Sequence, residues 1–255
     1  MLRGLHLTAT GMVAQQLRQE VISHNLANAD TPGFKAELAR LESFPPFLLS
    51  RMAGQSVEAN IGDLYPGVMV DTLVTDFRPG PLEETGRPTD LALVDNPESA
   101  PTFFAVQVGE EVRYTRDGSF RLGPEGILET KDGYPVLGQS GPVRVGEAGW
   151  QVDARGGVWL DGALVDNLLV VTFADPQRLQ KSGDNLFQAP PDLEATEVAE
   201  GTQVKQGFLE KSNLDVVRET VNMLAALRAY EAGQKLVQVQ DDLLGKTVNE
   251  VGALR

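Results

Sequence analysis

Cysteine is absent from this 255-residue sequence, and histidine occurs only twice. Without cysteine the chain forms no disulfide, and it has no thiolate metal ligand and no cysteine nucleophile. His6 and His24 are 18 positions apart, which separates them by about 27 Å on a helix, so they cannot bind one metal ion within a single chain. We therefore expect no metal site, no cofactor and no cofactor-binding residue.

Basic residues are also scarce, with 22 Lys and Arg against 36 Asp and Glu and a formal charge of −14. Nucleic-acid binding requires clustered positive charge, so we expect no nucleic-acid partner. No stretch reaches the roughly 18 apolar residues needed to span a bilayer. Near the N-terminus, Gln15, Gln16, Arg18 and Glu20 interrupt any apolar signal core. We expect neither membrane insertion nor a cleaved signal peptide.

Each catalytic motif in the sequence is incomplete. Gly-Lys-Thr at 245–247 resembles the end of a phosphate-binding loop, but the glycine required at position 240 is Gln240. Gly-Gln-Ser-Gly at 138–141 misses the spacing of a nucleophile elbow, and no histidine follows it. Acidic pairs such as Asp241-Asp242 leave a glycosidase-like acid pair open. We predict no catalytic residue and no enzymatic activity.

The N-terminal segment has the periodicity of an amphipathic helix. Its apolar residues recur at steps of three or four, which places them along one stripe: Leu2, Leu5, Ala9, Val13, Leu17 and Val21. The sequence Asn-Ala-Asp-Thr-Pro-Gly at 28–33 is predicted to end this helix. Pro32 disfavours a helical conformation at Thr31, and Gly33 permits a positive φ.

The C-terminal segment is predicted to be a much longer helix. From Leu214 to about Val248 the sequence contains no proline, and about 35 helical residues would extend some 50 Å. Ser212 and Asn213 are candidate N-cap residues. A second apolar row lies beside the main one, which indicates two neighbours: Leu236, Val239 and Leu243. One neighbour could be the N-terminal helix, paired with it in a coiled-coil-like stalk.

The middle of the chain reads as an antiparallel β domain. Short alternating runs such as 103–108 are followed closely by turn signals such as Asp117-Gly118 and Asp161-Gly162. Residues 38–75 suggest an extended connector with one short helical stretch.

We therefore predict an α+β fold in which paired terminal helices form a coiled-coil-like stalk and the central domain is an antiparallel β structure. The predicted segments are an N-terminal helix at 1–35, an extended connector at 36–78, the β domain at 79–190, a return connector at 191–206 and a C-terminal helix at 207–255.

Two motifs near the chain ends carry a family resemblance. Asn-Leu-Ala-Asn-Ala-Asp-Thr-Pro-Gly-Phe-Lys at 25–35 resembles the N-terminal signature of bacterial flagellar axial proteins, and Gly-Phe-Leu-Glu-Lys-Ser-Asn-Leu-Asp at 207–215 resembles their C-terminal signature. Residues 85–93 and 114–120 are similar to the β domain of the rod proteins. The chain thus resembles the basal-body rod and hook–basal body family, of the distal-rod or proximal-rod type.

The resemblance implies a structural function. Members of this family assemble through their terminal helices into a helical tube that transmits torque for motility. The implied partners are copies of the chain, other flagellar axial proteins of the rod and hook, and the flagellar type III export apparatus. The implied location is the flagellar basal body, reached without a cleaved signal peptide. The alternatives are a non-flagellar cell-surface binding module on a helical stalk and a wall-degrading glycosidase.

The resemblance also implies a set of subunit-interface residues. Sequence pattern alone leaves open that the same residues end a helix or close a monomer core. The predicted interface and stalk residues are Leu5, Val13, Leu17, Asn28, Thr31, Pro32, Gly33, Phe34, Ser212, Asn213, Leu224, Leu227 and Tyr230.

Overall fold

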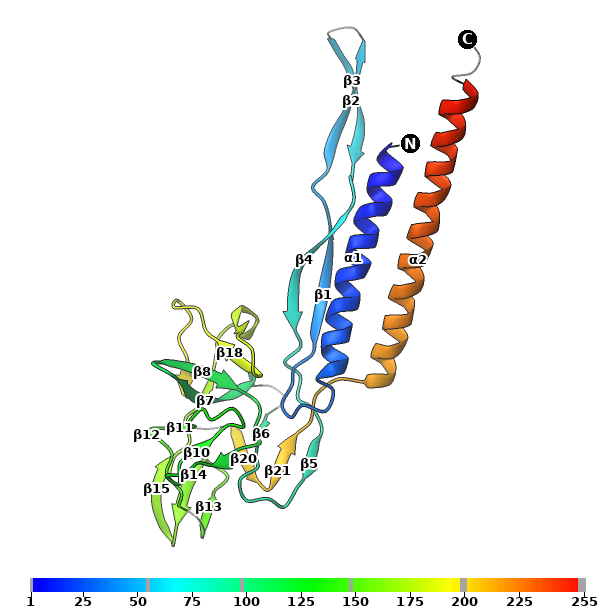
Figure 1. Cartoon of the computed structure of the whole chain (residues 1–255). Helices are drawn as coiled ribbons and strands as arrows, with labels where there is room; N and C mark the ends of the chain where they lie inside the picture. The colour runs from blue at the N-terminus through cyan, green and yellow to red at the C-terminus, as the bar shows by residue number, and fades with distance from the viewer. Residues whose placement is uncertain (1, 54–55, 97–98, 147–148, 198–200, 252–255) are drawn as a thin grey trace. The chain divides into compact units, whose positions relative to one another are not determined.

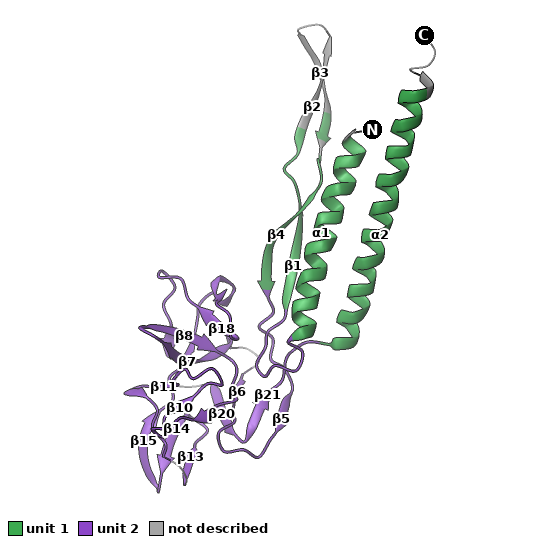
Figure 2. Ribbon diagram, in the orientation of Figure 1, with its two compact units in different colours: residues 1–27, 37–74, 215–255 green, residues 28–36, 75–214 purple. Residues whose placement is uncertain are grey.

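The computed structural model describes residues 2–53, 56–96, 99–146, 149–197 and 201–251. The chain divides into two compact units, coloured separately in Figure 2. Unit 1 comprises residues 1–27, 37–74 and 215–255, and unit 2 comprises residues 28–36 and 75–214. Both units are assembled from segments that are far apart in the sequence.

Unit 1 contains the two long helices, which contact each other along the unit (Figure 1). Helix α1 spans Leu2–Ala27, and helix α2 spans Val216–Lys246 and continues as a π-helix over Thr247–Val251. The two backbones approach closely at Gly233, where an added Cβ atom would lie 2.6 Å from Cγ of Met12. A glycine at this position therefore allows a separation between the helices that a larger residue would increase.

The start of α2 corrects the predicted N-cap. The N-cap residue is Asp215, whose carboxylate accepts hydrogen bonds from the backbone N–H groups of Val217 and Arg218 at 3.1 Å each. An aspartate at this position satisfies free N–H groups and also favours the positive end of the helix dipole. Ser212 and Asn213 do not cap the helix, because their side chains bind other backbone groups.

A pair of β-ribbons fills the segment for which a short helical stretch was predicted, and that prediction was wrong. Strand β1 (Glu37–Ser43) pairs with β4 (Val68–Thr75), and β2 (Phe47–Ala53) pairs antiparallel with β3 (Ser56–Leu64). The proline-containing sequences that suggested an irregular connector fall in the breaks between these strands, where proline costs no ladder hydrogen bond. The backbone pairing between strands outweighed the local helical signal.

The β1–β4 ribbon lies against α1 within unit 1. At one break in the ribbon, Gly67 accepts a hydrogen bond from the Phe44 N–H at 3.0 Å. A Cβ atom on Gly67 would lie 2.5 Å from Oγ1 of Thr10 in α1. Gly67, whose φ is +156°, therefore permits a close approach of ribbon and helix.

Unit 2 is built from short strands, and every pairing whose register is resolved in it is antiparallel. Its largest sheet has the order β17-β18-β8-β7-β16-β19. The strands are β5 Leu82–Glu84, β6 Leu91–Asp95, β7 Thr102–Val108, β8 Glu111–Thr115, β9 Arg121–Leu122, β10 Leu128–Glu129, β11 Leu137–Gly138, β12 Gly141–Pro142, β13 Trp150–Val152, β14 Gly157–Leu160, β15 Ala163–Asn167, β16 Val170–Thr172, β17 Gln180–Lys181, β18 Leu186–Gln188, β19 Thr196–Glu197, β20 Thr202–Gln206 and β21 Phe208–Glu210, with a 3₁₀ turn at Pro176–Arg178.

Strand β7 divides the core of unit 2 into two clusters, because successive side chains of a strand point to opposite faces. Phe104 packs edge-to-face on Phe120, with ring centroids 5.2 Å apart, in the larger cluster. Phe103 packs in the smaller cluster against Phe173 and Phe187. The central β domain expected from the sequence thus has cores on both faces of its principal sheet.

The C-terminal part of the chain enters unit 2 before α2 begins. Strand β20 pairs with β6, and β21 pairs with β5. Residues 202–210, predicted to be partly connector and partly helix, are therefore strands of the β domain. The architecture is α+β, with an N-terminal helix, a C-terminal helix and a central antiparallel β domain.

Candidate functional site

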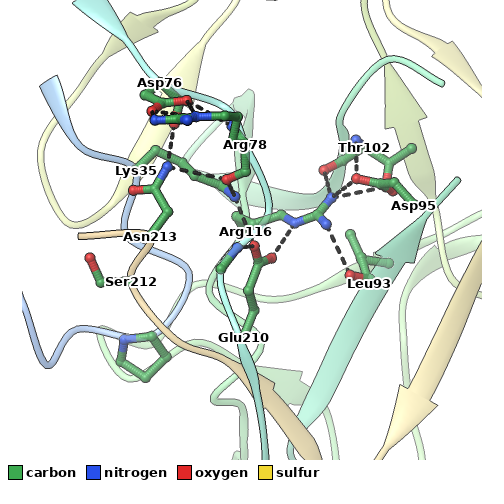
Figure 3. A network of polar contacts seen from close by, with 12 residues as sticks. Lys35, Asp76, Arg78, Leu93, Asp95, Thr102, Arg116, Glu210, Ser212 and Asn213 are labelled. Atoms are coloured by element: carbon green, nitrogen blue, oxygen red, sulfur yellow. Dashed lines mark hydrogen bonds and ion pairs between the residues drawn. The ribbon is translucent and has the colours of Figure 1, made fainter. Parts of the chain in front are cut away.

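The two terminal motifs meet at a buried cluster of charges in unit 2 (Figure 3). Lys35 Nζ lies 2.8 Å from Oε1 of Glu210, and Arg116 Nε lies 2.6 Å from Oε2 of the same carboxylate. Arg116 Nη1 is 2.8 Å from Oδ2 of Asp95. The side chains of Lys35, Arg116 and Glu210 are each 1% exposed. Two cations and two carboxylates therefore balance one another away from water.

Backbone groups complete the coordination of this cluster. Lys35 Nζ donates to the carbonyl oxygen of Arg78 at 2.8 Å, and Arg116 Nη2 donates to that of Leu93 at 2.9 Å. Glu210 Oε1 also accepts from the Gly80 N–H at 2.7 Å. Buried charges require this degree of pairing, because an unpaired charge in an apolar interior is strongly unfavourable.

Protonation in the cluster follows from burial and from the neighbouring charges. Burial raises the pKa of Glu210, but the charges of Arg116 and Lys35 and their hydrogen bonds outweigh it, so the pKa lies below the ordinary value. Burial lowers the pKa of Lys35 despite the opposing attraction of Glu210. The Glu210 carboxylate is thus held ionised, with Arg116 as its permanently charged partner.

Gly33 and Phe34 lie in the interior of unit 2. Gly33 has φ +65°, and a Cβ atom there would lie 2.3 Å from the carbonyl oxygen of Arg116. Its N–H donates to the Glu210 carbonyl at 2.7 Å. The Phe34 ring is buried, with Lys181 Nζ 4.4 Å from its centroid. These two residues therefore shape the single chain, and an interface role for them stays a prediction.

The other residues of the N-terminal motif form the turn after α1. The Thr31 N–H donates to the Asn28 carbonyl at 3.1 Å, and the Pro32 carbonyl accepts from Nδ2 of Asn185 at 2.9 Å. All three motif residues, Asn28, Thr31 and Pro32, are half-buried. They keep part of their surface available for a neighbour.

Asn213 joins three segments of unit 2. Its Oδ1 accepts from the Ala36 N–H at 3.0 Å, and its Nδ2 donates to the carbonyl oxygens of Asp76 at 2.7 Å and Arg78 at 3.1 Å. Ser212 is buried, and its hydroxyl accepts from the Leu214 N–H at 3.3 Å. Both residues thus position the backbone that leads toward α2.

The predicted stalk residues on the helices are mostly exposed in the single chain. Val13 is 57% exposed, Leu224 52% and Leu227 40%, while Leu5 and Tyr230 are half-buried. Leu17 is also exposed, and α2 carries two groups of exposed apolar side chains separated by residues 228–235: Val216, Val217, Val221, Leu224 and Leu227, and then Leu236, Val239 and Leu243.

A different face mediates the contact between α1 and α2. Among the described residues of α2, the buried ones are Ala226 and Gly233. Gly233 of α2 lies against Met12 and Thr8 of α1, and Gly4 of α1 lies against Gln240 of α2. Shielded residues recur at steps of three and four along α2, at Ala226, Tyr230, Gly233 and Val237, and Met12, Gln15, Gln19 and Ile22 of α1 are shielded with the same spacing. Ala226 and Gly233 are small, and this contact leaves Val13, Leu17, Leu224 and Leu227 exposed.

Three residues that organise the structure were not predicted from the sequence. Arg116 and Glu210 are charged residues within the motifs that carry the family resemblance. Nothing in the sequence indicated that these two side chains are buried. Asn25 is 1% exposed, and its side chain accepts from the Glu37 N–H at 3.0 Å and donates to the Glu37 carbonyl at 2.7 Å. The Asn25 amide thus binds both backbone groups of Glu37, as a residue on a neighbouring strand would do.

Within the described ranges, no group of three or more His, Cys, Asp or Glu side chains could hold a metal ion. No helix in the described part of the chain combines the length and apolar character needed to cross a membrane.

Comparison with known proteins identifies the family. Residues 6–35 match the family described as "Flagella basal body rod protein", residues 101–160 match "Flagellar hook protein FlgE/F/G D1 domain", and residues 205–250 match "Flagellar basal body rod FlgEFG protein C-terminal". These regions contain both terminal motifs and part of the β domain.

Relatives match along nearly the whole chain. The chain is 34% identical over 271 residues to the flagellar hook-basal body complex protein FlhO of Bacillus subtilis (strain 168), with 100% of both chains covered. It is 32% identical to the flagellar basal-body rod protein FlgG of the same organism, covering 98% of this chain and 99% of the relative. It is also 32% identical to the rod protein FlgF of Escherichia coli (strain K12), covering 94% of each. The chain therefore belongs to the flagellar basal-body rod protein family, whose members are structural proteins and not enzymes.

Proposed function

We propose that this chain is a structural subunit of the flagellar basal-body rod, and that it assembles through α1 and α2 into a helical tube that carries torque passively. The observation that carries the proposal is the set of exposed apolar side chains on both terminal helices. Large exposed apolar surfaces mark sites of association. Family membership supports the structural role and the flagellar location.

The apolar rows supply the driving force for assembly. Complete burial of a leucine or valine side chain contributes about 1.5–3 kcal/mol. Helix α2 carries eight such side chains that are exposed in the single chain, namely Val216, Val217, Val221, Leu224, Leu227, Leu236, Val239 and Leu243. Burial against neighbouring subunits stabilises the helices only in the assembly, because binding partners stabilise the state that they bind. Folding of the helical unit and polymerisation are then coupled.

The helices pair in a coiled-coil-like arrangement within this assembly. The alternating three- and four-residue spacing of shielded positions on α1 and α2 supports this, since a heptad seam has the same spacing. One side of each helix then faces the other helix of the same chain. The opposite side, with Val13 and Leu224, faces neighbouring subunits.

The proposed partners are copies of this chain and other flagellar axial proteins of the rod and hook. Relatives named as rod and hook–basal body proteins support these partners. Passage through the flagellar type III export apparatus, without cleavage of a signal peptide, is part of the proposal and suits a chain that contains no cysteine. No observation favours the alternative of a stalked binding module outside the flagellum.

Leu227→Asp tests the proposal. A carboxylate at this position in α2 cannot be buried against a neighbour without a large desolvation cost, so cells that carry only this variant should build no rods and should not swim. Leu164→Asp is the matched control, because Leu164 is 50% exposed and lies on β15 of unit 2.

Comparing Leu227→Asp with Leu164→Asp shows whether rods assemble through α2 or through the β domain as well. Leu227→Asp should retain wild-type tryptophan fluorescence, because Trp150 and Trp159 belong to unit 2 and Leu227 belongs to unit 1. Leu164 pairs directly with Trp159, so the folding of Leu164→Asp is checked by far-ultraviolet circular dichroism instead. Normal rods from the Leu227→Asp variant would contradict assembly through α2. Loss of rods in both variants would show that the β domain contributes equally.

A further inference from the structure

We infer that residues 202–211 form a strap that closes unit 2, with Glu210 as its anchor, so that the β domain completes its fold only after this late segment of the chain has docked. The inference concerns the folding of unit 2 and does not depend on assembly through the helices. It rests on strand pairing, core packing and the buried charges of Figure 3.

The strap provides the strand partners of two earlier strands. Its first half pairs with β6 from Thr202↔Asp95 to Gln206↔Leu91, and its second half pairs with β5 from Phe208↔Glu84 to Glu210↔Leu82. In the part of the chain that the structure describes, each of these is a two-stranded pairing. Before the strap docks, the backbone groups that face it on β5 and β6 have no strand partner.

The strap also covers the larger core cluster. Val204 is buried in that cluster, together with Leu91 and Leu93 of β6. The Val204 N–H donates to the Ala154 carbonyl at 3.1 Å, so the strap contacts a second part of the domain at the same point. Absence of the strap would expose apolar side chains that are fully buried in the complete domain.

Glu210 connects the strap to the charges on the earlier segments. Lys35 precedes it by 175 residues and Arg116 by 94 residues. Without the strap, Arg116 keeps its ion pair with Asp95, but Lys35 loses the carboxylate with which it pairs. Removing one member of a buried ion pair leaves an uncompensated charge, which is costly compared with the net stability of a domain. An incomplete unit 2 therefore favours a state in which Lys35 and Arg116 remain in water.

Backbone hydrogen bonds of the strap fix the register at which Glu210 enters the cluster. The Gly33 N–H donates to the Glu210 carbonyl at 2.7 Å, and the Lys211 N–H donates to the Pro81 carbonyl at 2.9 Å. The Glu210 side chain and backbone thus bind three segments that are separated in sequence. A carboxylate at a shifted register would lose these backbone bonds.

The first experiment compares two full-length variants by hydrogen exchange and mass spectrometry. In Glu210→Gln, which removes the charge but keeps the shape, exchange in β7, β8 and β16 should accelerate at least about 100-fold. The control is Glu83→Gln on β5, where the carboxylate pairs with Lys211 at 3.1 Å and is 54% exposed. This control should change exchange less than about three-fold, because exposed ion pairs contribute little.

The comparison of Glu210→Gln with Glu83→Gln has one outcome that supports the inference and one that overturns it. Faster exchange confined to β5, β21 and their connections in Glu210→Gln would overturn the inference, because the strap would then be a local feature. Failure of Glu210→Gln to fold, beside normal folding of Glu83→Gln, would support it.

A second experiment uses the unaltered chain. The full-length protein is refolded from denaturant and pulse-labelled with deuterium. Amides of β7 and β16 should gain protection in the same kinetic phase as those of β6 and β20. Protection of β7 and β16 in an earlier phase would show that the domain folds without the strap, and would overturn the inference whatever the variants do.

Discussion

Asn213 accepts a hydrogen bond from the backbone N–H of Ala36 at 3.0 Å, although 177 residues separate the two in sequence. The same side chain donates to the carbonyl oxygens of Asp76 and Arg78. One amide therefore holds together three segments of unit 2 that the chain order keeps far apart.

Replacing this amide should weaken unit 2. Asn213→Ala removes the partners of one N–H and two C=O groups, so the free energy of unfolding should fall by about 1–3 kcal/mol. Urea unfolding followed by tryptophan fluorescence measures this, because both tryptophans lie in unit 2. Asn222→Ala in α2 is the control and should leave the transition unchanged. An unchanged transition in Asn213→Ala would remove Asn213 from the residues that hold the domain.

Glycine at position 33 is required by the backbone and by the space around it. Gly33→Ala places a Cβ atom against the Arg116 carbonyl and strains a positive φ, and should lower the free energy of unfolding of unit 2 by more than about 2 kcal/mol. Gly11→Ala is the matched substitution in α1, where a Cβ atom meets nothing within 4 Å. It should increase helicity in circular dichroism. Equal effects of the two substitutions on the fluorescence transition would contradict the geometry at Gly33.

Acidification should destabilise unit 2 through Glu210. Its pKa in the folded state is below the ordinary value of 4.5, so the ionised carboxylate contributes stability above about pH 4.5, and this contribution is lost as the pH falls through the lowered pKa. The difference in unfolding free energy between wild type and Glu210→Gln should therefore shrink as the pH decreases from 7 to 3. Urea titrations at a series of pH values measure this difference, and a constant difference would contradict the lowered pKa.

Close approach of α1 and α2 should depend on Gly233. Gly233→Leu introduces a side chain into the position of Met12, so the helices should separate and the variant should fail to enter rods. Gly245→Leu is the control, because the surroundings of Gly245 are open within 4 Å. Rod assembly in cells that carry each variant tests this. Normal assembly by Gly233→Leu would show that this close contact is dispensable.

Hydrogen exchange in the isolated chain should be slow in unit 2 and fast in the terminal helices. Most side chains of α2 are exposed, whereas β7 lies between two core clusters. Amides of residues 2–27 and 216–246 should exchange at least about ten-fold faster than those of 102–108. Uniform protection would indicate that the helices already form a closed core before assembly.

The sequence predicted the helices more reliably than their contacts. Apolar periodicity predicted a helix at each end of the chain, where α1 and α2 lie, because a helix repeats every 3.6 residues whatever it packs against. The predicted ranges 1–35 and 207–255 extend beyond the helices, since α1 ends at Ala27 and α2 begins at Val216. The same periodicity did not reveal which face contacts the other helix. That face contains Gly233, because close approach of the two helices requires a small residue opposite Met12, and glycine is not part of an apolar stripe.

The candidate site was predicted in part for a similar reason. Residues 25–35 and 207–215 were singled out by their motifs, but the pairing of Lys35 with Glu210 and Arg116 could not be derived from them. Ion pairing across 175 residues leaves no periodic signal. The N-cap was misplaced because Ser212, Asn213 and Asp215 are all good capping residues, and the tertiary bonds of Asn213 decided which one was free to cap.

Some properties of this protein follow from the sequence by itself. They are the absence of disulfides and thiolate chemistry, the two terminal helices, the turn-rich β region and the motifs that indicate the flagellar family, because composition, periodicity and short motifs are local properties. The tertiary structure decided that residues 202–211 belong to the β domain, that four distant charges balance one another, and that many apolar side chains of the helices, such as Val13 and Leu224, remain exposed. Each of these depends on which segments meet in space, and burial, charge balance and strand pairing are settled only when those segments are brought together.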